Sequence, residues 1–314
     1  MSSRPFTRGT IALGLTPIGT TGAAVVARLA EEACAAEAVG FDGVTLSEHH
    51  AGFAHYLPSP QVVTAYLLSR LASAWAVPCP AILPLRRPVL VAEDLAWLHA
   101  AYPGRVGAGF VAGYQQQDFE VTGADFDSRN KTFWAGLAEV ARSLDAAQSA
   151  VGADPAIAAL RPGDIPLLAG IGGPVGVRRA AECGAGLLVT SLRTPSECAE
   201  LVQAYAAAGG THSVVLIRRV HVGTDATGFA ASESEWQSRS DSPSWLSAAD
   251  GALITGSAED VAKQLADAVR ETGCTSLNLR LDAYTGDDSQ VARQIELLGR
   301  EVLPSVRAEF AEQK

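Results

Sequence analysis

Two adjacent histidines stand where a predicted strand ends, and their side chains are the ones in this chain best suited to chemistry. Residues 42–47 alternate apolar and polar side chains, which is the period of a strand, and Glu48, His49 and His50 follow directly. Imidazoles exchange protons near neutral pH and also bind metals. With Glu48 and His55 nearby, we expect chemistry at this place. The alternative is one histidine hydrogen-bonded in the core and the other exposed.

The composition indicates a protein that acts on small molecules. The chain has 314 residues, of which 48% are hydrophobic and 18% charged, and its formal charge is -10. This charge disfavours nucleic acid and anionic membranes as partners, so a neutral or apolar small molecule fits better. The length suits an α/β barrel formed as one unit, and we expect residues 1–314 to be a single domain.

Cysteine usage and hydropathy indicate a cytoplasmic protein. The five cysteines are scattered without a C-x-x-C pair, which disfavours a disulfide framework and a zinc site and is typical of a reducing compartment. No apolar run reaches the roughly 18 residues that cross a bilayer, and residues 1–10 lack the apolar core of a signal peptide.

Strands and helices alternate along the chain. Apolar runs predict strands over residues 10–15, 42–47, 75–83, 105–110, 165–169, 186–190, 213–222 and 275–281. Helical spacing predicts helices over residues 23–39, 61–72, 89–101, 128–147 with Asp127 as N-cap, 175–183, 196–207, 258–272 and 289–303.

This alternation predicts a parallel sheet closed into a (β/α)8 barrel, the TIM barrel of the α/β class. Such barrels carry their sites at the carboxyl ends of the strands. The residues that would meet there are His49, His50, Gly113, Tyr114, Gly172, Ser191 and Arg280.

A glycine turn leaves the fifth predicted strand and opens a helix. In Ile171-Gly172-Gly173-Pro174, backbone amides at a helix N-terminus could hold a phosphate, with Arg178 or Arg179 one turn on. The same residues also make an ordinary tight turn.

A longer series of residues resembles the bacterial luciferase-like family of flavin-dependent oxidoreductases. It comprises Glu48-His49-His50, Pro58-Ser59-Pro60, Leu83-Pro84-Leu85, Pro88, Ala92-Glu93-Asp94-Leu95-Ala96, Gly104-Arg105-Val106, Gly109, Gly113-Tyr114, Asp118-Phe119, Gly123 and Arg129. The resemblance implies a (β/α)8 barrel that binds FMN, or the deazaflavin coenzyme F-420, across its mouth. It implies that His49 is the catalytic acid/base residue and that His50 contacts substrate or stabilises the loop. Glu48 either orients His49 or is a buried structural carboxylate.

The resemblance also concerns cofactor binding. Where relatives often carry a non-prolyl cis peptide bond under the flavin, this chain has Cys79-Pro80, which predicts a cis bond here too. Ala112 replaces an arginine that helps luciferases to hold the flavin phosphate, so phosphate binding would depend on residues 172–176, with Arg178, Arg179 or Tyr114. The predicted cofactor-binding residues are Cys79, Pro80, Gly113, Tyr114, Gly170, Gly172, Gly173, Gly176 and Ser191.

Residues 223–256, after the seventh strand, lack periodicity and contain Trp236 and Trp245. A connection of this length in a barrel is typical of a lid, and a solvated loop is the alternative. The predicted substrate contacts are Phe53, His55, Tyr56, Trp236 and Trp245.

The function that these features favour is a two-component flavin-dependent monooxygenase, in which reduced FMN comes from a separate flavin reductase and O2 oxygenates a small organic substrate. No nicotinamide fingerprint lies in a strand–turn–helix context, which agrees with an outside reductant. The alternatives are F-420-dependent hydride transfer, a flavin-binding paralogue without catalysis, and a metal-dependent hydrolase that uses His49, His50 and His55. Adjacent histidines on a strand point to opposite faces, which is poor spacing for a metal. Relatives imply a homodimer formed through residues 61–72 and 88–101.

Overall fold

A run of parallel strands closes around the centre of the molecule. The structure is a computed structural model that describes residues 3–191, 193–223, 253–281 and 288–312. The strands are β1 (Ile11–Gly14), β2 (Gly43–Leu46), β3 (Trp75–Pro78), β4 (Ala81–Ile82), β5 (Ala108–Val111), β6 (Leu167–Gly170), β7 (Gly186–Val189), β8 (Val214–Val222), β9 (Leu253–Gly256) and β10 (Ser276–Leu281). Their order is β3-β2-β1-β10-β8-β7-β6-β5-β4, and β9 pairs with β8 outside this path.

The barrel closes at one strand that is split in two. β3 pairs with β2 and β4 pairs with β5, both in parallel, and only Cys79 and Pro80 separate β3 from β4. The two short strands together therefore serve as the third strand of an eight-stranded barrel, which confirms the predicted fold class. The bond between Cys79 and Pro80 is cis, as predicted.

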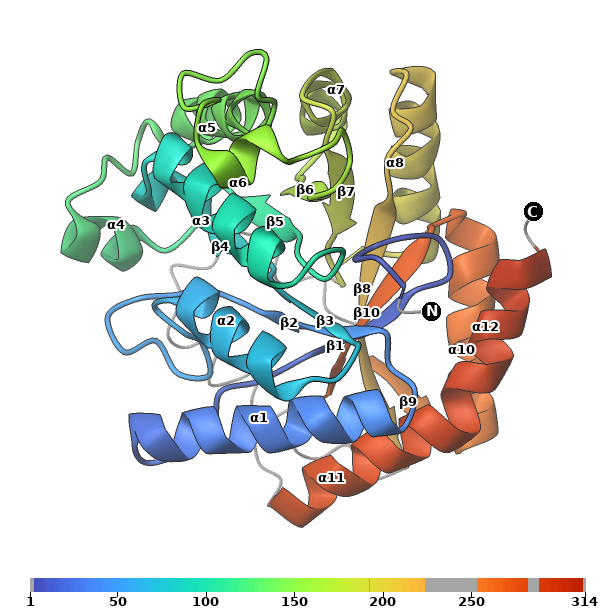
Figure 1. Cartoon of the computed structure of the whole chain (residues 1–314). Coiled ribbons are helices and arrows are strands. Elements are labelled where there is room, and N and C mark those ends of the chain that lie inside the picture. The colour runs from blue at the N-terminus through green and yellow to red at the C-terminus, as the bar shows by residue number, and fades with distance from the viewer. Residues whose placement is uncertain (1–2, 192, 224–252, 282–287, 313–314) are drawn as a thin grey trace.

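Helices surround the barrel (Figure 1). They are α1 (Gly22–Ala38), α2 (Pro60–Arg70), α3 (Pro88–Ala101), α4 (Gln116–Thr122), α5 (Arg129–Ser143), α6 (Pro155–Ala158), α7 (Pro174–Glu182), α8 (Pro195–Ala207), α10 (Ala258–Thr272), α11 (Asp288–Leu297) and α12 (Leu303–Glu312), with a 3₁₀ turn at Leu83–Leu85 and a π turn at Leu298–Val302. None of the described helices is long and apolar enough to cross a membrane.

Local sequence explains where these helices begin and which face they bury. The side chain of Thr21 accepts a hydrogen bond from the amide of Ala24 and so caps α1, while Ser257 and Asp260 form a capping box on α10. Helical spacing then places small and branched apolar residues against the sheet. On α1 these residues are Leu29, Ala30, Ala33 and Ala36.

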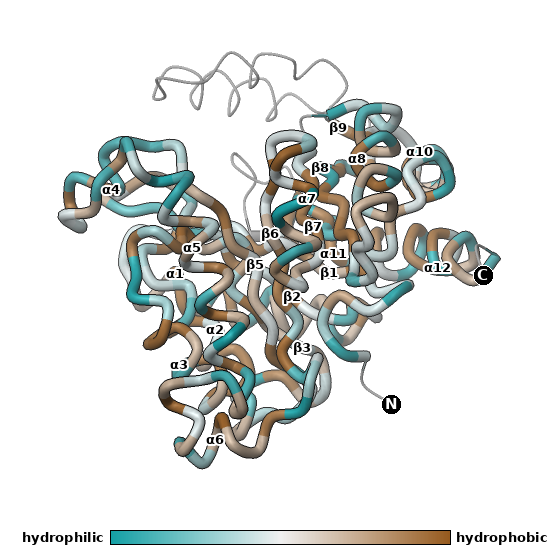
Figure 2. Tube along the Cα trace, turned by 90° about the horizontal axis from the view of Figure 1, so that it is seen from above, coloured by the Kyte–Doolittle hydropathy of each residue, from teal (hydrophilic) through white to brown (hydrophobic). Residues whose placement is uncertain are grey.

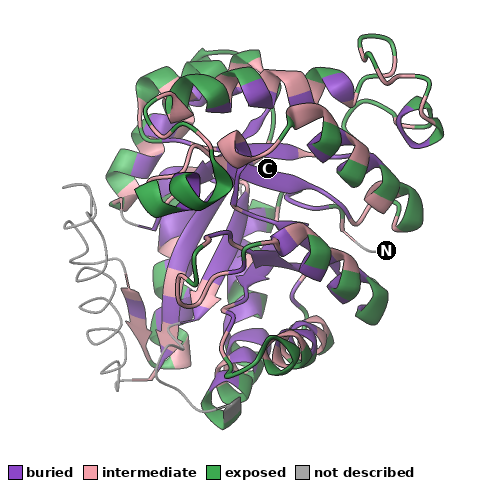
Figure 3. Cartoon of the chain, turned by 90° about the vertical axis from the view of Figure 1, so that its left-hand side faces the viewer, coloured by how far each residue is buried: buried purple, intermediate pink, exposed green. Residues whose placement is uncertain are grey.

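The barrel interior is apolar at the amino end of the strands. Phe6 and Trp75 meet there edge to face, with ring centroids 5.3 Å apart. Gly43 leaves room for the indole, because a Cβ atom at that position would lie 2.0 Å from the Trp75 ring. Figure 2 shows hydrophobic residues gathered on the strands, and Figure 3 shows the strands buried while the outer helix faces are exposed. The amino end is thus plugged, which leaves the carboxyl end for a site.

Some predicted elements differ from the structure. The predicted strand 75–83 is interrupted at Cys79 and ends in a 3₁₀ turn. Asp127 does not cap α5, because the N-cap position is Ser128 and no side-chain hydrogen bond caps this helix. Helix α4 and strand β9 were not predicted, since both are too short to establish a period.

The predicted insertion follows β8, the seventh barrel strand. Its last residues, 253–256, are not part of a loop but form β9, which pairs in parallel with β8. Residues 224–252, with Trp236 and Trp245, lie outside the described part of the chain.

Candidate active site

His49 is held by a carboxylate that comes from another element. Its Nδ1 lies 2.7 Å from Oδ2 of Asp118 on α4, and Oδ1 of the same carboxylate accepts a hydrogen bond of 2.7 Å from the backbone amide of His50. The side chains of His49 and Asp118 are 5% and 1% exposed. A carboxylate at Nδ1 is a hydrogen-bond acceptor, so Nδ1 carries the proton and Nε2 is left to exchange one. This role of Asp118 was not predicted from the sequence.

Glu48 is a buried carboxylate, which is one of the two roles expected for it. Its Oε1 accepts hydrogen bonds from Nε2 of His50 at 2.9 Å and from Nη2 of Arg86 at 2.5 Å, and its Oε2 accepts one from the amide of Ile82 at 2.7 Å. Asp118, and not Glu48, therefore orients the His49 ring. Glu48 instead fixes His50 and ties the end of β2 to β4.

Aromatic rings surround the His49 imidazole. Phe53 stacks on it at 4.4 Å between ring centroids, while Tyr56 and Tyr114 approach edge-on at 4.6 and 5.1 Å. Tyr114 comes from the loop after β5, so residues after two different strands meet at this imidazole. The result is a histidine with one fixed nitrogen in a largely apolar enclosure, an arrangement suited to proton transfer away from bulk water.

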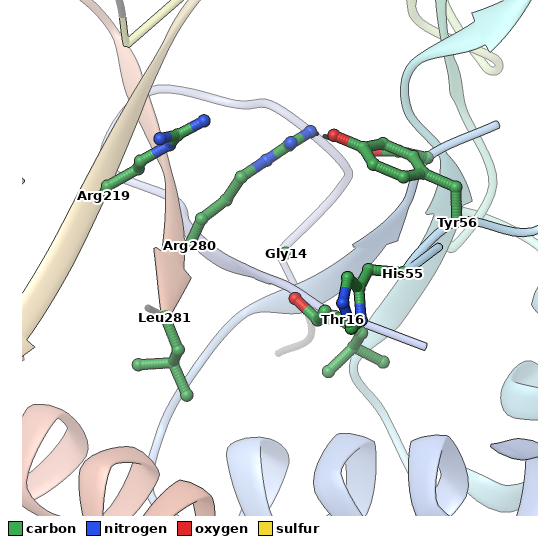
Figure 4. Close-up of a pocket in the computed structure, with 9 residues that line it drawn as sticks. Gly14, Thr16, His55, Tyr56, Arg219, Arg280 and Leu281 are labelled. Carbon is green, nitrogen blue, oxygen red and sulfur yellow. Dashed lines mark hydrogen bonds between the residues drawn. The ribbon is translucent and has the colours of Figure 1, made fainter. Parts of the chain in front are cut away.

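A pocket lies beside this cluster at the barrel mouth (Figure 4). Its lining includes Thr16, Ser47, His55, Tyr56, Arg219 and Arg280. Tyr56 belongs to both the pocket and the enclosure of His49. Nη2 of Arg280 donates a hydrogen bond of 2.7 Å to Oγ of Ser47, which in turn lies 3.4 Å from the carbonyl oxygen of Cys79. The pocket thus extends to the peptide group that follows β3.

Cys79 is a packing residue in its present surroundings. Burial raises the pKa of its thiol to about 12, against a smaller lowering by the charge of Arg280. Its Sγ fills the space next to Gly109, where a Cβ atom would lie only 2.3 Å away. The thiol is therefore neutral at physiological pH and does not act as a nucleophile.

The glycine turn between β6 and α7 forms a second cluster. A Cβ atom on Gly172 or Gly173 would meet nothing within 4 Å, and no side chain caps the N-terminus of α7 at Gly173. Nη2 of Arg193, from the loop after β7, donates a hydrogen bond of 2.8 Å to the carbonyl oxygen of Gly172. Backbone amides at a helix N-terminus, open space beside the two glycines and a nearby guanidinium group make this turn fit for a phosphate.

The other predicted cofactor residues have identifiable local roles. Gly113 has a φ of 82° and lies where a Cβ atom would collide with Ile82 and Phe119, so the loop after β5 requires glycine. Gly170 faces Val111, and Gly176, which is part of α7, packs against Ile171. Ser191 is buried in the loop that follows β7. Arg178 and Arg179 are exposed on α7, and Arg179 lies over the Trp134 ring.

In the described residues, no group of three His, Cys, Asp or Glu side chains is placed to hold a metal ion. His49 and His50 are each engaged by a different carboxylate.

Comparison with known proteins finds a matching family model and curated relatives. A family model described as luciferase-like monooxygenase matches residues 8–276. The alkanal monooxygenase alpha chain of Photorhabdus laumondii is 36% identical over 115 residues, which is 36% of this chain and 32% of that protein. The match thus spans about a third of this curated relative.

Solved structures share the fold at low sequence identity. Monooxygenase RslO1 from Streptomyces bottropensis is 18% identical with a TM-score of 0.78, covering 94% of this chain and 99% of that one. An F420-dependent secondary alcohol dehydrogenase bound to an F420-acetone adduct is 19% identical with a TM-score of 0.75, covering 95% and 98%. The oxygenating constituent of 3,6-diketocamphane monooxygenase from Pseudomonas putida, in complex with FMN, is 16% identical with a TM-score of 0.71, covering 94% and 98%.

Proposed function

The chain belongs to the luciferase-like monooxygenase family, and on that premise we propose that it is the oxygenating component of a two-component monooxygenase that uses reduced FMN and O2 on a small organic substrate. The observation that carries the proposal is the His49–Asp118 pair, enclosed by aromatic rings at the barrel mouth. Bound FMN would supply the redox chemistry with oxygen, and the protein would supply orientation, exclusion of water and protons.

His49 is the catalytic acid/base residue in this proposal. Asp118 holds Nδ1, so Nε2 gives and takes the proton. His50, anchored by Glu48, is a substrate contact or loop anchor at the same edge. Phe53, His55 and Tyr56 line the substrate side, since Tyr56 reaches both His49 and the pocket.

The glycine turn is the proposed site for the phosphate of the cofactor. Gly172, Gly173 and the uncapped start of α7 offer backbone amides, and the Ser191 hydroxyl and Arg193 lie on the neighbouring loop. Arg193 provides a cation close to this turn, which compensates for the alanine at position 112. The cis peptide at Cys79-Pro80, with Tyr114, would face the ring system.

Hydride transfer with coenzyme F-420 is the second candidate. It is supported by the likeness in fold to the F420-dependent secondary alcohol dehydrogenase. The same histidine would then act as acid or base for an alcohol or ketone, and oxygen would not be consumed.

We also propose two partners. Reduced FMN would come from a separate flavin reductase that binds transiently. The exposed outer faces of α2 and α3 carry Val62, Tyr66, Leu90 and Trp97, and this apolar surface supports a homodimer formed through these helices. Sedimentation velocity of the wild-type chain and of Leu90→Glu would test the dimer.

Anaerobic titration with reduced FMN and with reduced F-420 separates the two functions. We expect saturable binding of FMN, weakened about tenfold or more in Arg193→Met because a charged hydrogen bond to phosphate is lost. Arg142→Met, which removes an exposed arginine from the last turn of α5, is the matched control. Binding of F-420 alone would favour hydride transfer, and binding of neither would refute the cofactor assignment.

A further inference from the structure

The loop after β2 returns to the strand that it leaves. Residues 49–57 make this loop, which we call the β2 loop. Leu57 pairs in parallel with Glu48. The amide of His49 donates a hydrogen bond of 3.2 Å to the carbonyl oxygen of Leu57, and the amide of Leu57 donates one of 3.2 Å to that of Ser47. The β2 loop therefore begins and ends at the carboxyl end of β2.

The backbone of the β2 loop adopts a conformation that non-glycine residues disfavour. Ala51 and His55 have φ values of 55° and 68°, in the left-handed region, and Gly52 has a φ of 72°. The amide of Phe53 donates a hydrogen bond of 3.0 Å to the carbonyl oxygen of His50, which forms a turn within the loop. Because such a backbone persists only where surrounding contacts fix it, the contacts that close the loop decide its shape.

One arginine joins the two ends of the β2 loop. Arg86 follows the 3₁₀ turn after β4, and its Nη2 donates hydrogen bonds to Oε1 of Glu48 at 2.5 Å and to the carbonyl oxygen of Pro58 at 3.2 Å. Glu48 directly precedes the loop and Pro58 directly follows it. The Glu48 side chain is fully buried and that of Arg86 is 27% exposed, so this ion pair is largely shielded from water and is stronger than one on an open surface.

The β2 loop carries two of the rings that enclose His49. Phe53 stacks on the imidazole at 4.4 Å between ring centroids, and Tyr56 approaches it edge-on at 4.6 Å. The two rings also meet each other at 5.5 Å. Tyr56 lines the pocket at the barrel mouth as well (Figure 4). The shape of the loop thus sets both the enclosure of His49 and one wall of the pocket.

We propose that Arg86 is a positioning residue that holds the β2 loop closed and thereby places Phe53 and Tyr56 against His49. It acts through Glu48 and the Pro58 carbonyl group. This inference rests on the proposed function, in which His49 is the acid/base residue, and adds to it the group that shapes the substrate side of the site.

The cation of Arg86 is the part that this role requires. One nitrogen of the guanidinium group makes both contacts, with a carboxylate and with a carbonyl oxygen. A lysine ammonium can donate to the same two acceptors as a point charge, whereas methionine fills similar space without donating. Arg86→Lys should therefore keep part of the closure, and Arg86→Met should lose it.

Proton NMR of the flavin-free chain tests the proposal at His49 itself. The Phe53 ring lies over the imidazole and shifts the resonances of its carbon-bound protons, which are assigned by their absence in His49→Ala. Phe53→Leu gives the change that complete loss of stacking produces. We expect Arg86→Met to produce about half of that change or more, because the stacked geometry depends on the closed loop. Arg86→Lys should produce a smaller change, and Arg142→Met, which removes an exposed arginine of α5, none.

Amide hydrogen exchange in the same samples reports the closure of the loop. The Leu57 amide, which donates to Ser47, should exchange about tenfold or more faster in Arg86→Met, because a hydrogen bond to a charged group is lost and the loop opens more often. Arg86→Lys should exchange at a rate between those of wild type and Arg86→Met. Arg142→Met should exchange as the wild type does.

Three results would overturn the proposal. One is a set of His49 resonances in folded Arg86→Met that coincide with those of the wild type. Another is an equal change in Arg86→Lys and Arg86→Met, which would show that the cation does not hold the loop. The third is unchanged exchange of the Leu57 amide in Arg86→Met. If circular dichroism shows that Arg86→Met does not fold, Arg86→Gln takes its place with the same expected outcomes. Failure of FMN to bind would contradict the proposed function and leave these flavin-free measurements decisive.

Discussion

Nδ1 of His49 lies 2.7 Å from Oδ2 of Asp118, a residue 69 positions later in the chain. The other carboxylate oxygen accepts the amide of His50, so one buried side chain holds both the imidazole and the backbone beside it. This double contact fixes the position of the ring and the nitrogen that carries the proton. The proton-transfer chemistry proposed for the barrel mouth depends on this pair.

Replacing Asp118 by asparagine should change the tautomer of His49. The asparagine oxygen would accept the hydrogen bond from the amide of His50, so the asparagine NH2 group would point at Nδ1 of His49. Nδ1 would then have to be the acceptor, and the imidazole proton would be on Nε2. Nitrogen-15 NMR of the six histidines reads this exchange directly. Asp125→Asn, on an exposed turn, is the control. An unchanged tautomer in Asp118→Asn would show that the pair does not set the proton position.

Replacing Glu48 by glutamine should lower the free energy of unfolding. The Glu48 carboxylate is fully buried and accepts hydrogen bonds from Arg86, His50 and the amide of Ile82. In glutamine an NH2 group replaces one of the two oxygens and would point at a hydrogen-bond donor, which would then have no acceptor. We expect a loss of about 1.5–3 kcal/mol, since hydrogen bonds to charged groups contribute that much. Urea unfolding measures it, with the exposed Glu31→Gln as control. Equal midpoints for the two variants would contradict this role.

Gly14→Ala should disturb Arg280 without removing its charge. The new Cβ atom would lie 2.9 Å from Cγ of Arg280 and 3.2 Å from Oδ1 of Asn278. We expect a loss of about 1–3 kcal/mol in the free energy of unfolding, which is typical of overpacking. Gly22→Ala, where a Cβ atom meets nothing within 4 Å, should not destabilise the chain. Urea unfolding curves of both variants check this, and an unchanged stability of Gly14→Ala would refute the need for glycine.

The protein should lose stability at alkaline pH through its buried thiols. Burial raises the pKa of Cys79 to about 12 and that of Cys274 to about 11, above the ordinary value of 9.0. Above pH 9 the unfolded thiol loses its proton while the folded one keeps it, so the stabilisation present below pH 9 is lost as pH rises to 11–12. By pH 10 each of the two thiols should have lowered the free energy of unfolding by about 1.4 kcal/mol.

Urea unfolding at pH 8 and pH 10 tests this expectation, with Cys79→Ala as the variant. Its loss of stability between the two pH values should be smaller than that of the wild type by about 1.4 kcal/mol. Cys34→Ala, whose thiol is only partly buried, is the matched control and should lose as much as the wild type. An identical pH dependence in Cys79→Ala and wild type would contradict the prediction.

The barrel was predictable because its long elements are strongly periodic. Each predicted barrel strand corresponds to an observed one, and the motif around Cys79-Pro80 predicted the cis bond correctly. What the sequence could not predict were short elements without a period, such as α4 and β9, and the interruption of the third strand. These features depend on contacts between distant parts of the chain.

Much of the candidate site could not be predicted from the sequence either, because it also depends on contacts between distant parts of the chain. His49 and His50 stood out by residue type, but their carboxylates depend on α4 and β2, and Asp118 appeared only as one residue of a family motif. Arg193 and the pairing of Arg219 with Arg280 follow from strand register and loop placement. Alternation along β8 and β10 was the available signal for the two arginines, because it places both on the inner face.

The most direct test of the central claim is to mix the anaerobic complex with reduced FMN into oxygenated buffer and record absorption spectra for wild type and His49→Ala. If His49 is the acid/base residue of an FMN-dependent monooxygenase, the wild type will give a transient near-ultraviolet spectrum distinct from both reduced and oxidised FMN. Its lifetime should change by about 10²-fold or more in His49→Ala, as general acid–base catalysis implies. His212→Ala, which changes an exposed histidine before the amino end of β8, is the control. Reoxidation at the rate of free FMN in the wild type, or identical transients in wild type and His49→Ala, would contradict the claim.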